Sequence, residues 1–102
     1  MARNIADESQ VKEGSQKAKR LRERELSDIR FILETEMGRR FVWRYLSLAG
    51  VFQTSFTGNS TTFFNEGRRD IGLKLLADVS EAKPEAYLQM AHEAKKGDEN
   101  DA

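Results

Sequence analysis

The chain contains no cysteine. Disulfide bonds, thiolate metal sites and cysteine nucleophiles are therefore excluded, and the composition fits a protein made in a reducing compartment. The opening MARNIADESQ has no apolar signal core, and no apolar run reaches the roughly 18 residues that a membrane span needs. We expect a soluble protein that is not secreted by this route and has no membrane partner.

The chain also has little of what catalysis needs. His92 is its single histidine and lies among Glu93, Lys95 and Lys96, with no metal-ligand spacing around it. The serines show no nucleophile-elbow pattern, and the glycines do not reproduce a phosphate-binding loop. We therefore expect no enzyme, no metal and no cofactor.

The 102 residues suffice for one small domain with a modest core. Charged residues make up 33% of the chain and hydrophobic ones 38%, which indicates that part of it is solvated rather than packed. We expect residues 1–19 to form a flexible arm, or one that orders only on a partner. Residues 20–96 would form the helical domain, and residues 97–102 a frayed acidic tail after a helix end at Gly97.

Apolar residues recur at helical spacing in four segments, and no segment alternates with the period of a strand. The first predicted helix covers about residues 21–34. Thr35 then caps a second, which Gly50 ends, and a third begins near residue 62 and buries one apolar face. Pro84 suits the first position of a fourth. The predicted core residues are Leu26, Ile29, Leu33, Phe41, Val42, Tyr45, Leu46, Ala49, Phe64, Ile71, Leu75, Leu76, Val79, Tyr87, Leu88 and Ala91. The fold class is all-α, a small bundle of three to four helices with a long ordered loop between helices two and three.

That loop and the start of the next helix read GVFQTSFTGNSTTFFNEGRR, from Gly50 to Arg69. We interpret Phe52 and Phe56 as aromatic plugs that pin the loop to the helices, and Gly58-Asn59 as its turn. The hydroxyls of residues 60–62 would cap the third helix, and Phe63 and Phe64 would return the chain to the core. This interpretation leaves Gln53, Thr54 and Ser55 to contact a neighbouring subunit.

Basic side chains gather in three places although the formal net charge is zero. They are candidate contacts to nucleic-acid phosphates. The alternative is ordinary ion pairing on helix surfaces, since acidic residues lie nearby in the sequence. A helix-turn-helix is disfavoured because the loop after residue 50 is too long. The candidate contacts are Lys17, Lys19, Arg20, Arg22, Arg24, Arg39, Arg40, Arg68 and Arg69.

Three apolar side chains fall off the predicted core stripes, namely Trp43, Leu48 and Leu73. Another helix could bury them, or they could anchor a protein partner, for which tryptophan is favoured. With the loop, the candidate partner-binding residues are Trp43, Leu48, Phe52, Gln53, Thr54, Ser55, Phe56 and Leu73.

The segment from Glu34 to Met90 resembles a family of small virion-associated proteins of tailed bacteriophages, chiefly short-tailed podophages. Four stretches carry the resemblance: GRRF with Trp43 (residues 38–43), VF through SFTGN (51–59), NEGRR (65–69) and PEAY (84–87). The resemblance implies a structural component of the phage particle without enzymatic activity.

A structural role implies other phage proteins as partners, in the portal, neck or capsid, with multiple copies in a symmetric assembly and possible proximity to packaged DNA. The expected location is the virion, after synthesis in the host bacterial cytoplasm. The alternative function is a nucleic-acid-binding or DNA-packaging accessory protein that acts through the basic clusters.

Overall fold

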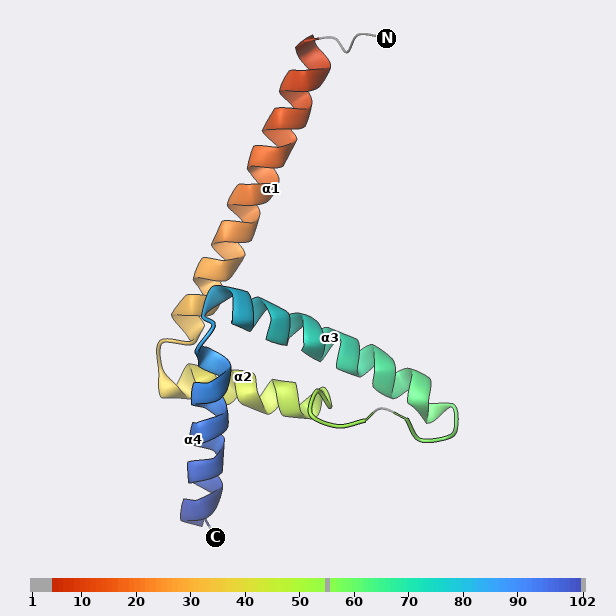
Figure 1. The fold of residues 1–102 in the computed structure, drawn as a ribbon, viewed down its shortest axis with the longest axis vertical. Helices are drawn as coiled ribbons and strands as arrows, with labels where there is room; N and C mark the ends of the chain where they lie inside the picture. Colours follow the sequence, from red (N-terminus) through yellow and green to blue (C-terminus); the bar gives the residue numbers. More distant parts are fainter. Residues whose placement is uncertain (1–4, 55, 102) are drawn as a thin grey trace.

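The structure is a computed structural model that describes residues 5–54 and 56–101. This part of the chain forms four helices and no strand: α1 (Ile5–Ile32), α2 (Glu36–Leu48), α3 (Thr61–Ala82) and α4 (Ala86–Asp101). A long connection, residues 49–60, joins α2 to α3 (Figure 1). The all-α prediction with four helices is confirmed.

Helix α1 begins at Ile5, so the prediction that the first helix starts near residue 21 is wrong. Residues 7–19 are exposed along their whole length and project from the body (Figure 1). Their polarity suggested an arm, but the segment lacks proline, is rich in good helix formers, and carries Asp7 and Glu8 in the first turn, where acidic groups favour a helix. Residues 1–4 lie outside the described part. Ordering of residues 1–19 by a partner stays a prediction.

Both ends of α2 lie where its capping residues predict. The Thr35 hydroxyl accepts a hydrogen bond from the Gly38 amide at 3.0 Å. At the other end Gly50 has a φ of 77°, its amide donates to the Ser47 carbonyl, and the Val51 amide donates to the Leu46 carbonyl at 3.3 Å. These two bonds form a Schellman motif, which brings Val51 back against Leu46 in the core.

The start of α3 is organised differently from the prediction. Gly58 does turn the loop, with a φ of 78°. However, the Asn59 side chain, rather than a hydroxyl, accepts the Thr61 amide at 2.9 Å. Ser60 makes no side-chain cap, and the Thr62 hydroxyl instead accepts from the Thr57 amide. An Asx turn therefore starts the helix, because the asparagine amide oxygen reaches the amide two residues on.

Two predictions about α4 are wrong. The helix begins at Ala86, so Pro84 lies in the preceding turn and not at the first helical position. It also continues through Gly97 to Asp101. A glycine ends a helix only when its backbone takes the left-handed conformation, and Gly97 does not.

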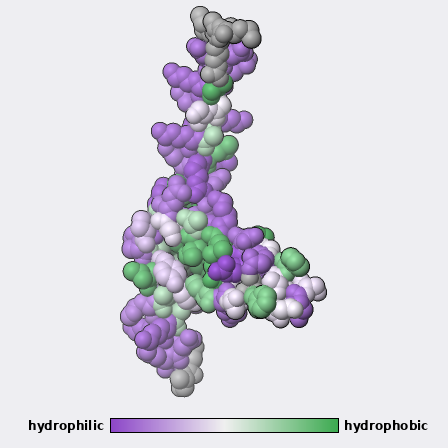
Figure 2. Space-filling view, turned by 45° about the vertical axis from the view of Figure 1, so that its right-hand side comes forward, coloured by the Kyte–Doolittle hydropathy of each residue, from purple (hydrophilic) through white to green (hydrophobic). Residues whose placement is uncertain are grey.

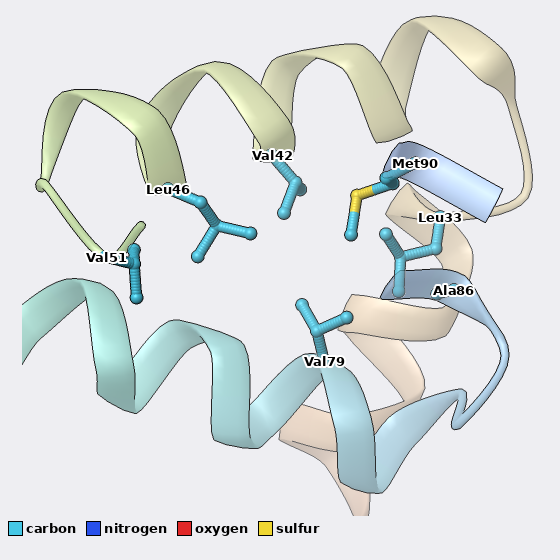
Figure 3. Close-up of a cluster of buried hydrophobic side chains, with 7 residues drawn as sticks. All are labelled: Leu33, Val42, Leu46, Val51, Val79, Ala86 and Met90. Atoms are coloured by element: carbon cyan, nitrogen blue, oxygen red, sulfur yellow. The ribbon is translucent and has the colours of Figure 1, made fainter. Parts of the chain in front are cut away.

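The helices pack chiefly as two pairs, α1 with α3 and α2 with α4, and α3 also contacts α2 and α4. Figure 3 shows the core where the four helices meet: Val42 and Leu46 point from α2 toward α3, and Val79 points back. Leu33, at the end of α1, and Met90, on α4, close the cluster. All five side chains are buried.

The molecule is long and thin. It measures 67 × 39 × 15 Å and has a radius of gyration of 19.2 Å, where a compact domain of this length has about 13 Å. Helix axes pack about 8–10 Å apart, so a thickness of 15 Å admits at most two layers of helices. Figure 2 shows hydrophobic atoms gathered on the central body, whereas the projecting part of α1 and the far end of α4 are hydrophilic.

The small core leaves several predicted core residues outside it. Phe41, Tyr45, Phe64, Ile71 and Leu88 are 46–75% exposed. Each lies on a stripe of correct helical spacing, but no third layer covers that side of its helix. The prediction that they are buried is therefore wrong.

The turn between α1 and α2 leaves no room for a side chain at Gly38. A Cβ at this position would overlap the carbonyl oxygen of Ile32. We predict that Gly38→Ala lowers the free energy of unfolding by about 2 kcal/mol, as overpacking does. The matched control is Gly67→Ala in α3, where a Cβ meets open space and should stabilise by about 0.5–1 kcal/mol. Urea unfolding followed by circular dichroism measures both, and equal effects would contradict the close approach.

Candidate functional site

Trp43 and Phe52 form an aromatic cluster with Tyr87. The rings of Trp43 and Phe52 stack with centroids 4.8 Å apart, and Tyr87 lies 6.1 Å from Trp43 and 6.3 Å from Phe52. Trp43 is half-buried against the core. The start of the α2–α3 connection is thus fixed to α2 and α4, as predicted for Phe52.

The remaining phenylalanines of this region do not pack. Phe56 is 73% exposed, Phe63 82% and Phe64 70%. The predictions that Phe56 plugs the loop and that Phe63 and Phe64 rejoin the core are wrong, because the first turn of α3 extends beyond the end of α2 and no other helix lies against it (Figure 1). Gln53 and Thr54 are exposed. Ser55 lies outside the described residues.

The two other candidate anchors, Leu73 and Leu48, lie in different surroundings. Leu73 is half-buried against the core, which is the first of the two alternatives that the sequence left open, and its contact with a partner stays a prediction. Leu48 is 54% exposed and lines a concave apolar surface between α2 and α3, which we call the α2–α3 groove.

The α2–α3 groove has a volume of about 510 Å³ and an almost wholly apolar lining. Its exposed side chains come from both walls and from the end of α1. The sequence predicted most of them as core residues, because helical periodicity marks an apolar face without showing what covers it. They are Ile32, Phe41, Tyr45, Leu48 and Ile71, and half-buried Leu75 lies beside them.

Two of the predicted nucleic-acid contacts serve the fold instead. Arg22 joins α1 to α3, with its guanidinium 2.8 Å from Asp78 and 2.6 Å from Glu81. Glu25 contacts the same group at 3.0 Å. Hydrogen bonds to Glu81, then Asp78 and Glu25, raise the pKa of Arg22.

Arg39 is the second, and it is buried. Its Nε donates to the Glu93 carboxylate at 2.9 Å, and its Nη1 donates to the Leu33 carbonyl at 2.9 Å. The side chain thus ties α2 to α4 and to the end of α1. Arg22 and Arg39 are thus held in ion pairs within the fold. Sequence proximity indicates Glu25 as a partner of Arg22, but it could not show Asp78 or Glu93, which lie more than fifty residues away.

The other basic candidates lie on three different helices and do not contact one another as a single patch. Lys17, Arg20 and Arg24 share one side of α1 by helical spacing and are exposed, as is Lys19. Arg40 is exposed on α2, 3.9 Å from Glu36. On α3, Arg68 lies over the Phe64 ring with its Cζ 5.9 Å from the centroid. Arg69, one residue on, is half-buried.

Among residues 5–54 and 56–101 no three acidic, histidine or cysteine side chains lie together as a metal site would require. Over the same residues, no helix combines the length and apolar character that crossing a membrane demands. The features that remain are apolar and charged surfaces.

The family model of Bbp19-like phage proteins matches residues 29–92, which is more than half of the chain. The chain belongs to this family. Searches of curated proteins and of solved structures found no match. The Bbp19-like region starts at Ile29, near the end of α1, and contains all of α2 and α3, so the core and the α2–α3 groove lie within it. The projecting part of α1 lies outside it.

We predict that the Arg39 network is a major source of stability in this Bbp19-like protein. Arg39→Ala leaves the Glu93 carboxylate and the Leu33 carbonyl without their donor, and should cost about 2–4 kcal/mol. Arg40→Ala removes an exposed arginine from the next position and should cost less than about 0.5 kcal/mol. Chemical denaturation of both variants checks this, and a small effect at Arg39 would contradict the role assigned to it.

A pH-dependent contribution comes from Asp78. Lys74, the main cause, and Arg22 donate hydrogen bonds to its carboxylate and lower its pKa below the ordinary 3.8. A lowered folded-state pKa contributes stability above the ordinary value, which is lost as the pH falls through the folded-state pKa. Asp78→Asn should therefore destabilise the protein at pH 7, with a difference from wild type that shrinks below about pH 4.

Thermal unfolding from pH 7 to pH 2 measures this difference. The control is Asp70→Asn, an exposed residue of the same helix that forms no ion pair within the described part of the chain. The thermal stability of this control should change with pH in parallel with that of the wild type. A constant difference for Asp78→Asn across the range would exclude the ion pair as its cause.

Proposed function

We propose that this Bbp19-like phage protein is a structural protein of the virion, a small helical subunit bound in multiple copies to the portal, neck or capsid. It acts by binding other phage structural proteins and carries out no reaction, and it needs no cofactor. Made in the bacterial cytoplasm, it ends in the particle, with possible proximity to the packaged DNA.

The exposed apolar surface is the observation that carries this proposal. In the described part of the chain fourteen large hydrophobic side chains are exposed, against eight buried hydrophobic residues. A monomer that stays free in solution seldom leaves so much apolar surface uncovered, whereas a subunit buries it on assembly. A partner that binds only the folded form also stabilises a protein with a small core, by mass action.

The shape supports binding at several points. Helix α1 has 28 residues and is therefore about 40 Å long, and more than half of it extends away from the body (Figure 1). In a closed ring or shell such a helix can reach a neighbouring subunit, and repeated head-to-tail contacts close by symmetry.

The alternative is a nucleic-acid-binding or packaging accessory protein. One observation favours it: Lys17, Arg20 and Arg24 share an exposed side of α1. It is the weaker hypothesis, because Arg22 and Arg39 are held in ion pairs within the fold.

We predict that the protein is present in purified mature particles, in many copies per particle. Quantitative mass spectrometry of gradient-purified phage, with the portal protein as internal reference, measures this. Absence from particles, together with duplex DNA binding that weakens steeply as salt rises in a filter-binding titration, would overturn the structural proposal and favour the alternative.

A further inference from the structure

The walls of the α2–α3 groove are two exposed apolar stripes. On α2 the stripe consists of Phe41, Tyr45 and Leu48, which are 46–59% exposed. On α3 it includes Ile71, 75% exposed, and half-buried Leu75. The spacing of three and four residues places each set on one side of its helix, so the groove has two continuous apolar walls.

This geometry fits a helix. Helices α2 and α3 run in opposite directions side by side (Figure 1), and a channel between two helices is the surface into which a third packs its ridge of side chains. Gly72 allows the close approach behind the groove, since a Cβ there would lie 2.5 Å from the Ala49 Cβ. An amphipathic helix with apolar residues three and four apart would fill the groove.

The charged side chains at the groove indicate which charge a partner should carry. The charged side chain that lines it is Arg68, and no carboxylate does so among the described residues. Arg44 lies at the α2 edge, with its Cζ 5.7 Å from the centroid of the Tyr45 ring. Neither arginine forms an ion pair in the described part of the chain. The groove is thus apolar with a basic rim.

We propose that the α2–α3 groove binds an amphipathic helix with acidic flanks that belongs to another protein. This inference rests on the proposed function for the partner's place in the virion, but the recognition itself follows from apolar walls and from two arginines that have no carboxylate partner among the described residues. A second copy fits less well, because two-fold pairing of the groove would bring the same basic rims together. The acidic end of α4, residues 97–101, carries no large apolar side chain to enter the groove.

A designed peptide tests the proposal without knowledge of the natural partner. The probe is a fluorescent helix of about 18 residues with leucines three and four apart on one side and glutamates flanking them. Its control carries lysines in place of the glutamates. Anisotropy titrations with the full chain should show the glutamate peptide binding at least about tenfold more tightly at about 0.05 M salt, with the preference reduced at about 0.3 M.

Variants assign the binding to the groove. Ile71→Glu should weaken binding of the glutamate peptide at least about tenfold. The control Leu88→Glu changes a residue of similar exposure, 72%, on α4. It should leave the affinity for the glutamate peptide unchanged. Arg68→Glu should reverse the preference in favour of the lysine peptide. Since all three positions are exposed, circular dichroism should show wild-type helix content.

Three results would overturn the proposal: equal affinity for the two peptides, binding that survives Ile71→Glu, or a wild-type dimer that Ile71→Glu converts to a monomer. The last would make a second copy the occupant. Particle mass spectrometry is independent of all three, so a protein present in virions whose groove rejects the acidic peptide would retain its proposed function and lose only this partner.

Discussion

The guanidinium of Arg39 ties the packed pair of α2 and α4 to the end of α1, which otherwise touches these two helices little. The helices pack chiefly as α1 with α3 and α2 with α4, and α1 makes few contacts with α2 or α4. Arg39 projects from α2, donates to Glu93 on α4 and to the carbonyl of Leu33 at the end of α1. Both acceptors satisfy a charge that burial would otherwise penalise. This contact helps to hold the corner between α1 and α2, while the packing of α1 against α3 and the Arg22 ion pairs hold the direction in which α1 leaves the body.

A fold held in this way leaves much of its apolar surface uncovered. Four helices in at most two layers enclose a few large side chains, among them Leu33, Leu46 and Met90, and leave apolar stripes on the outer sides. The same stripes would be core in a thicker bundle. The exposed surface is therefore a consequence of the architecture and not of a few misplaced residues, which is why the proposed binding surface lies on regular helices.

Local chemistry was enough to predict both ends of α2, because Thr35 and Gly50 act on backbone groups within four residues of themselves. Burial was harder, since the exposure of Ile71 depends on where α1 and α2 lie against α3, and periodicity carries no such information. For the same reason Arg22 and Arg39 stayed candidates for nucleic-acid contacts, with ion pairing as the alternative. Glu25 lies three residues from Arg22, but the partners Asp78 and Glu93 are distant in sequence, and only the folded chain brings them to the two arginines.

The groove and the core share a wall, so binding in the groove would be coupled to folding stability. Val42 lines the α2–α3 groove and is also buried in the core beside Leu46. A helix docked in the proposed manner would cover the outer sides of Phe41 and Ile71 and so extend that core by a further layer. Because the docked helix binds only the folded arrangement of α2 and α3, its binding energy adds to folding stability. In the proposed assembly the partner would thus complete a core that the chain alone leaves half covered.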